Sequence, residues 1–128
     1  MGIFGMNLSK KILIIDDDER ILTSLQDILA QEGYILSIAN NGKEGLKKCE
    51  TGELDLIITD IIMPDIEGIE LIRAIRRGNV NIPIIAMSGD FIGQKFLKAA
   101  RLFGAIDTLL KPFSAKELKD KINRALSR

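Results

Sequence analysis

The feature that most constrains the fold of this chain is a short apolar run followed by an amphipathic stretch, a pattern that occurs five times. The first run, Ile12 to Ile15, is unbroken, and a run so short and rich in β-branched residues is typical of a strand buried on both faces. Apolar residues then recur at helical spacing as far as Leu29, and Gly33 stands where a helix C-terminal cap is expected. The sequence therefore begins with a predicted strand followed by a predicted helix.

The repeated pattern predicts five strands and five helices. The strands are expected at Lys11 to Asp17, Tyr34 to Ala39, Leu54 to Thr59, Ile82 to Met87 and Ile106 to Leu110. The helices are expected around Ile21 to Leu29 and at Gly42 to Glu50, Gly68 to Arg77, Phe91 to Phe103 and Ala115 to Leu126. Because strands that alternate with helices over short connections pair in parallel through right-handed crossovers, the predicted fold class is α/β. The expected architecture is a three-layer α/β/α sandwich around a five-stranded parallel sheet.

Length and composition describe one ordinary domain. The chain has 128 residues, of which 46% are apolar and 28% charged, and no long linker or internal repeat interrupts the pattern. We expect the domain at residues 11–128, preceded at 1–10 by a leader or a remnant of expression, with no appended effector. No apolar run reaches the ~18 residues of a membrane span, and Met1 to Asn7 lacks the features of a secretory signal. These observations predict a cytoplasmic protein without a membrane partner.

Charge and residue content exclude several classes of function. The 18 basic and 18 acidic residues give zero formal net charge, so the chain lacks the long-range field that attracts nucleic acid, and no direct nucleic-acid partner is expected. The absence of histidine excludes metal sites with histidine ligands, histidine-based catalytic triads and a phosphohistidine carrier. The single cysteine, Cys49, lies near Leu46 on a predicted helix, where a packed thiol without a redox role is expected.

Polar residues follow the predicted strands at the edge where the carboxyl ends of parallel strands meet, which is where α/β folds bind ligands. They are Asp16, Asp17 and Asp18 after the first strand, Asp60 after the third, Ser88 after the fourth and Lys111 after the fifth. One aspartate could serve as a helix cap, but a cap does not need three carboxylates. If Asp16, Asp17 and Asp60 approach to about 4 Å, each pair repels by on the order of 4 kcal/mol at an effective dielectric constant near 20. A cation is therefore expected to bind there.

The residue types at this edge indicate which cation to expect. Oxygen ligands without histidine or cysteine favour a hard cation, and a few carboxylates that leave room for water and phosphate oxygens suit Mg²⁺ better than Ca²⁺. Lys111 adds a second positive charge, and Pro112 after it could end the strand and turn the ammonium group over the sheet edge. Alone, Lys111 would pass for a solvated lysine and Ser88 for a turn residue. Their position beside the acidic residues makes both of them candidates for the site.

Four short strings stand in a fixed order along the chain. They are Ile14-Ile15-Asp16-Asp17, then Asp55 to Pro64 with Gly68, then Met87-Ser88-Gly89, then Leu110-Lys111-Pro112-Phe113. Together they resemble the receiver domains of two-component response regulators, in the stand-alone, single-domain form, and the likeness covers Lys11 to Arg128. The resemblance implies a flavodoxin-like fold with strand order 2-1-3-4-5.

The resemblance also implies a function and a role for each matching residue. The domain would be a phosphorelay switch that accepts a phosphoryl group from a phosphohistidine of a sensor histidine kinase or a histidine phosphotransfer protein and then changes its binding to a downstream partner. It would catalyse only its own phosphorylation and dephosphorylation and would not otherwise be an enzyme. The implied roles are Asp60 as phosphoacceptor, Asp16, Asp17, Asp60 and the Ile62 backbone carbonyl as Mg²⁺ ligands, Ser88 as a contact to the phosphoryl group, and Lys111 as its ion-pair partner. Asp18 and Glu19 match no role and are expected to be acids at a helix N-terminus.

The sequence departs from the family pattern at Thr108, where receivers commonly carry an aromatic residue. A threonine cannot fill a ring-sized space, so we expect the signal to pass through the backbone of Ser88 to Phe91 into the helix that follows. The partner surface is then expected on that helix, the fifth strand and the last helix. Candidate contact residues are Gln94, Lys95, Lys98, Arg101, Lys119 and Asn123, with an ordinary solvated charged face as the alternative.

Three other interpretations fit the sequence less well. A flavin-binding module should offer amides and hydroxyls to phosphate after the first strand, where this chain has carboxylates, and no G-x-G or G-x-x-x-x-G-K string occurs. An aspartate-nucleophile phosphohydrolase should have a second acid two residues after the nucleophile, but Asp60 is followed by Ile61 and Ile62. A degenerate receiver that acts only as a docking scaffold would not need the complete set of site residues.

Overall fold

The computed structural model describes the backbone of residues 10–79, 81–89 and 91–127, and the side chains of the same residues except 91–94. The leader expected at 1–10 lies outside the described residues except for Lys10, and so does the side chain of Gln94. Among the described helices, none combines the length and the apolar character that a membrane crossing requires.

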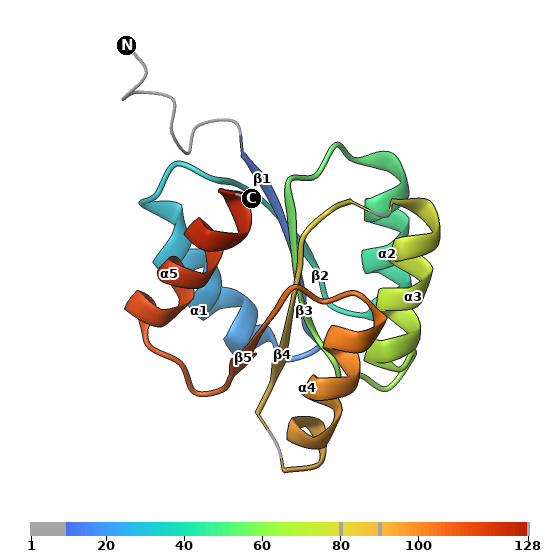
Figure 1. Ribbon diagram of the computed structural model, residues 1–128. Coiled ribbons are helices and arrows are strands. Elements are labelled where there is room, and N and C mark those ends of the chain that lie inside the picture. The colour runs from blue at the N-terminus through green and yellow to red at the C-terminus, as the bar shows by residue number, and fades with distance from the viewer. Residues whose placement is uncertain (1–9, 80, 90, 128) are drawn as a thin grey trace.

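Five strands and five helices alternate along the described part of the chain (Figure 1). They are β1 (Lys11–Ile15), α1 (Glu19–Ala30), β2 (Ile35–Ala39), α2 (Gly42–Thr51), β3 (Leu56–Asp60), α3 (Gly68–Gly78), β4 (Ile84–Ser88), α4 (Phe91–Phe103), β5 (Asp107–Leu110) and α5 (Ala115–Leu126). All strand pairs are parallel and the order across the sheet is β2-β1-β3-β4-β5. The predicted fold class and strand order are therefore confirmed.

The sheet is the middle of three layers. Helices α1 and α5 cover one face, and α2, α3 and α4 cover the other (Figure 1). The core divides in the same way, because alternate residues of a strand point to opposite faces. Leu13 and Ile15 of β1 pack in the cluster that includes Leu71 of α3, whereas Ile12 and Ile14 pack in the cluster that includes Leu25 of α1. Burial on both faces explains why the central strands are continuously apolar.

Several element boundaries differ from the predicted ones by one or two residues, and the first strand ends at Ile15 instead of Asp17. The starts of two other strands have a local reason. The third strand starts at Leu56 instead of Leu54, because the Asp55 carboxylate accepts a hydrogen bond from the Lys11 amide at 2.8 Å before the ladder begins. The fourth strand starts at Ile84 instead of Ile82, just after Pro83, which has no amide proton to donate. Both strands run one residue further than predicted, so Asp60 is the last residue of its strand.

The prediction that Gly33 caps the first helix was wrong in position. The C-cap of α1 is Gln31, whose amide donates to the Leu29 carbonyl. Gly33 lies two residues further on and has a φ of 84°, a left-handed conformation that lets the chain turn into β2. The expected acids at the start of α1 are confirmed, since Asp18 caps the helix by accepting from the Arg20 amide and Glu19 lies in its first turn.

Candidate functional site

The ends of four strands position the predicted site residues. Asp16 directly follows β1, Asp60 and Ser88 are the last residues of β3 and β4, and Lys111 directly follows β5. Because the sheet is parallel, the carboxyl ends of these strands lie at the same edge. The register also brings β4 and β5 together there, since the Lys111 amide donates to the Ser88 carbonyl at 2.8 Å.

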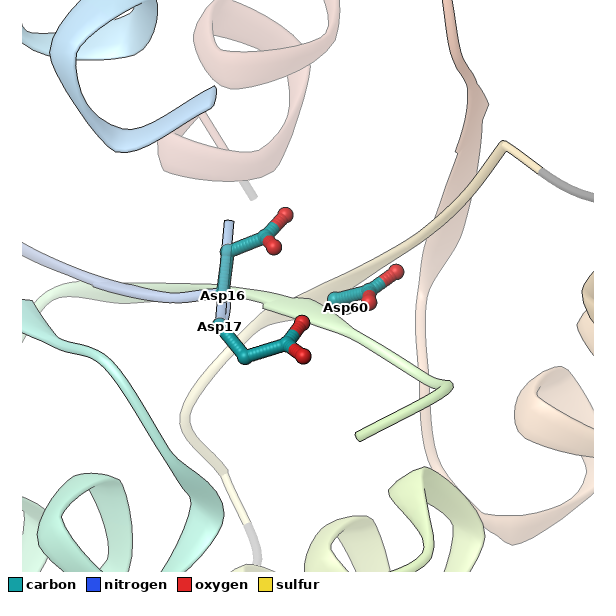
Figure 2. A group of neighbouring side chains, drawn as sticks. All are labelled: Asp16, Asp17 and Asp60. Carbon is teal, nitrogen blue, oxygen red and sulfur yellow. The ribbon is translucent and has the colours of Figure 1, made fainter. Parts of the chain in front are cut away.

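Three carboxylates form an acidic cluster at this edge. Asp16, Asp17 and Asp60 each offer an oxygen that lies within 4.8 Å of those of the other two. Figure 2 shows their carboxylates pointing to the same side, from the end of β1 and the end of β3. Asp16 and Asp60 are buried, whereas Asp17 is exposed. The cluster therefore has two buried acidic groups and one that faces solvent.

Lys111 provides the positive charge opposite these carboxylates. Its Nζ donates to Asp16 Oδ2 at 2.6 Å and lies 3.4 Å from Asp60 Oδ1. The side chain is only 15% exposed, so both ion pairs are largely shielded from water. Gly89 leaves room for it, because a Cβ at this position would lie 3.0 Å from the Lys111 Cβ. The expectation that the ammonium group turns back over the sheet edge is confirmed.

Ser88 carries a buried hydroxyl group that has no hydrogen-bond partner among the described residues. Its side chain is 1% exposed, and its Oγ is buried without a hydrogen-bond partner. Buried hydroxyl groups are normally hydrogen-bonded, since leaving one unpaired costs about 1–3 kcal/mol. An unpartnered hydroxyl beside a charged cluster therefore indicates a position where a ligand oxygen would complete the hydrogen bonding.

The predicted site residues share one pocket of about 310 Å³. It is lined by Asp16, Asp17, Asp18, Ile21, Asp60, Ile62, Ser88, Gly89 and Lys111. All six predicted site residues are thus brought together. Ile21 and Gly89 were not predicted as pocket walls, since no chemical signal marks an isoleucine or a glycine as a wall of a polar pocket.

The electrostatics of the pocket follow from burial and unequal charge. Burial raises the pKa of Asp60 to about 6, with Lys111 opposing the shift and the negative charges of Asp16 and Asp17 adding to it. Burial alone would lower the pKa of Lys111, but its hydrogen bonds and attraction to Asp16 and Asp60 outweigh burial and raise it. Three carboxylates therefore face one firmly protonated amine, and two negative charges remain uncompensated when all are ionised.

These residues fit the Mg²⁺ ion that the sequence predicts. The donor set consists of oxygens alone, and the three carboxylates are close enough to share one ion. Ile62 lines the same pocket. A divalent cation would neutralise the two uncompensated charges.

The predicted partner surface on α4, β5 and α5 is partly engaged in internal contacts. Arg101 donates to Asp107 Oδ1 at 3.0 Å, Lys119 lies 3.4 Å from Glu32, and Asn123 accepts from the Tyr34 hydroxyl at 3.4 Å. Lys95 and Lys98 are exposed. Thr108 is half-buried in β5, and its carbonyl accepts a hydrogen bond from Lys121.

The packed character expected of Cys49 agrees with its surroundings. The side chain is half-buried and packs against the core cluster on the α2 and α3 face of the sheet. Burial raises the pKa of the thiol to about 11, with a smaller contribution from Glu50. The thiolate form is therefore scarce at neutral pH, which disfavours redox chemistry.

Comparison with known proteins places nearly the whole chain in one group. The family model of the response regulator receiver domain matches residues 12–123. The chain is 38% identical over 122 residues to the alkaline phosphatase synthesis transcriptional regulatory protein PhoP of Bacillus subtilis, an alignment that covers 94% of this chain and 50% of PhoP. The chain thus spans about half the length of the curated relatives it matches.

Solved structures agree with this match. A response regulator receiver domain protein from Methanospirillum hungatei has a TM-score of 0.82 and 35% sequence identity, and the alignment covers 93% of this chain and 94% of that one. The response regulator TrrA from Thermotoga maritima, solved in complex with Mg²⁺-BeF, has a TM-score of 0.82 and 36% identity, with coverage of 91% and 99%. The likeness therefore extends to a protein whose structure holds magnesium.

Proposed function

The chain belongs to the response regulator receiver domain family, whose members are phosphoacceptor switches of two-component signalling, and we propose that Asp60 is the residue that receives the phosphoryl group. The observation that carries this proposal is the setting of the Asp60 carboxylate. It ends β3 at 6% exposure, 3.4 Å from the Lys111 ammonium group and beside the unpartnered Ser88 hydroxyl. Asp16 and Asp17 lie close enough to share a cation with it.

Asp60 is suited to act as the nucleophile. With a pKa of about 6 it is mostly ionised at neutral pH, so it needs no general base. An oxygen of its carboxylate attacks the phosphorus atom, and the bond from phosphorus to the departing nitrogen of a phosphohistidine breaks. The product is an aspartyl phosphate, and hydrolysis of this acyl phosphate returns the carboxylate.

The other site residues support this transfer by position and charge. Lys111 is held between Asp16 and Asp60, where its ammonium group can pair with a phosphoryl oxygen. The Ser88 hydroxyl can donate a hydrogen bond to a second phosphoryl oxygen. Asp16, Asp17, Asp60 and the Ile62 carbonyl would hold Mg²⁺, which when bound neutralises the charge on the phosphoryl oxygens.

The donor and the readout follow from what the chain contains. Since these 128 residues contain no histidine, the phosphohistidine has to lie outside them, and we propose a sensor histidine kinase or a histidine phosphotransfer protein as the donor. We propose residues 11–128 as the receiver unit, located in the cytoplasm, with the α4, β5 and α5 face as the surface read by a downstream protein. The expectation of no nucleic-acid partner rests on zero net charge alone and remains a prediction for this chain, because relatives include transcriptional regulators.

Labelling with a small acyl phosphate in Mg²⁺, followed by intact mass measurement, tests the assignment of Asp60. We expect the wild type to gain one phosphoryl group, a gain that requires the metal, and Asp60→Asn to gain none. The matched control is Asp27→Asn, which removes an exposed carboxylate on α1 and should label like the wild type. Labelling of Asp60→Asn at a rate comparable to the wild type would exclude Asp60 as the acceptor.

A further inference from the structure

The loop between β3 and α3, residues 61–67, carries a carboxylate, that of Asp65, that contacts the start of another helix. Asp65 Oδ1 accepts a hydrogen bond from the Gly42 amide at 3.0 Å, and Asp65 Oδ2 accepts one from the Lys43 amide at 2.9 Å. These are the first two amides of α2. The loop after β3 therefore caps a helix that begins more than twenty residues earlier in the chain.

Helix α2 already has a cap of its own. The Asn41 side chain accepts from the Glu44 amide at 2.8 Å, which is the usual N-cap hydrogen bond. Asp65 satisfies two further amides of α2, one of them from the buried Gly42, so the helix is also stabilised by this second cap. The contact also restrains the loop, because two hydrogen bonds from one carboxylate to a helix N-terminus fix the position of the loop backbone.

Packing and backbone contacts tie the same loop down on both sides of Asp65. A Cβ at Gly42 would lie 1.8 Å from Ile66 Cγ2, so the loop lies directly on the α2 N-terminus. At the base of the loop, the Gly68 amide donates to the Ile61 carbonyl at 3.0 Å, and the Ile61 amide donates to the Met87 carbonyl at 3.1 Å.

Ile62 lies between these tie points and connects them to the site. It follows the buried Ile61 and precedes Asp65 by three residues, and it lines the pocket that holds the acidic cluster. Its side chain is 40% exposed and contributes little to holding the backbone in place. The position of the Ile62 backbone therefore depends on the anchors on either side.

We propose that Asp65 is a positioning residue for the phosphorylation site: by capping α2 it holds the β3–α3 loop so that the Ile62 backbone stays at the pocket. The inference rests on the proposed function, in which the Ile62 carbonyl helps to hold Mg²⁺. The charge state of Asp65 agrees with this role. Burial alone would raise the pKa of Asp65, but the amides of Lys43 and Gly42 outweigh it and hold the pKa below its ordinary value.

The test compares Asp65→Ala with Asn41→Ala, which removes a cap from the same helix without touching the loop. Both variants should lower the thermal midpoint in chelator by similar amounts, since each removes a cap of α2. We expect faster amide hydrogen exchange at residues 61–67 in metal-free Asp65→Ala, but wild-type exchange in Asn41→Ala. The dissociation constant for Mg²⁺, measured by titration with the metal alone, should rise about tenfold in Asp65→Ala, as is usual when a group supporting a metal site is lost, and stay unchanged in Asn41→Ala.

Asp65→Asn supplies the conservative comparison, because an amide oxygen can accept from one of the two amides. Its loop exchange and Mg²⁺ affinity should lie between those of the wild type and Asp65→Ala. Wild-type exchange and affinity in Asp65→Ala, or equal changes in Asn41→Ala, would overturn the positioning role. The exchange readout is taken without metal, so it decides this proposal even if Asp60 proves not to accept a phosphoryl group.

Discussion

The two ends of the sheet both bury charge, but they satisfy it in opposite ways. At the carboxyl end, three carboxylates face the single ammonium group of Lys111, and the Ser88 hydroxyl has no partner. At the amino end, one guanidinium group, that of Arg76, donates to the carbonyls of Asn79, Ile82 and Gly104. The carboxyl end therefore has an excess of negative charge. At the amino end, a single positive group donates hydrogen bonds to three carbonyl oxygens.

The difference shows why we propose a binding site at the carboxyl end. Burial lowers the pKa of Arg76, yet both of its terminal nitrogens already donate to carbonyl groups. Gly104 allows this close approach, because a Cβ there would lie 2.7 Å from the Arg76 Nε. Burial of charge therefore does not by itself mark function. The marks of function here are the unequal number of charges and the unpaired hydroxyl.

The largest expected effect is the loss of Lys111. In metal-free protein, Lys111→Met leaves two buried carboxylates without their counter-ion and should lower the free energy of unfolding by on the order of 3 kcal/mol. Because a bound cation supplies the missing charge, Mg²⁺ should restore most of this loss. Urea unfolding with and without Mg²⁺ measures both effects. The control is Lys116→Met, which removes a lysine from an exposed pair with Asp120 and should change stability little.

The loss of Arg76 should also destabilise the fold, but without rescue by metal. Arg76→Met leaves the carbonyls of Ile82 and Gly104 without their donor and should cost about 2 kcal/mol in the free energy of unfolding. The substitution leaves no carboxylate without a counter-ion at this end. Mg²⁺ should therefore raise the free energy of unfolding of the variant by the same amount as that of the wild type. The neighbouring exposed arginine provides the control, Arg77→Met. A specific rescue of Arg76→Met by Mg²⁺ would remove the distinction between the two ends.

The dependence of the free energy of unfolding on pH isolates the contribution of Asp60 to stability. Because burial raises its pKa to about 6, folded protein keeps a proton that unfolded protein loses between about pH 4 and 6, so this group lowers stability as pH rises through that window. The expected decrease is about 1–2 kcal/mol in chelator, allowing for the coupling to Lys111. Asp60→Asn should lack this component. Parallel profiles of the two proteins would mean that the Asp60 carboxylate titrates normally.

The fold and most of the site were predictable because both depend on local patterns. The strand residues Ile12 to Ile15 alternate between two cores, so an unbroken apolar run was a sound sign of a central strand. The site followed because parallel strands bring Asp16, Asp60 and Lys111 to one edge regardless of their distance in sequence.

The contacts that escaped prediction join segments by geometry that no local pattern encodes. Asp65 stands in a stretch that reads as an ordinary turn, and its partners Gly42 and Lys43 lie far back in the chain. Arg76 occupies a helix position where an exposed arginine would look the same in sequence, and its acceptors become visible only once α3 and α4 are packed. The unpaired state of the Ser88 hydroxyl is likewise a property of packing, since the sequence shows only a serine before a glycine.

The most direct test of the account is the effect of Asp17→Asn on stability in chelator and in Mg²⁺. The three carboxylates should repel one another until a cation binds, and Asp17 is the exposed one of the three, so its removal should disturb packing least. Urea unfolding should find the variant about 1 kcal/mol more stable than the wild type in chelator, because the repulsion of Asp17 by Asp16 and Asp60 is relieved in a partly solvated setting. In saturating Mg²⁺ the wild type should be the more stable protein, because the variant has lost a metal ligand. A wild type that is equally or more stable in chelator would contradict the claim that this end of the sheet carries uncompensated charge.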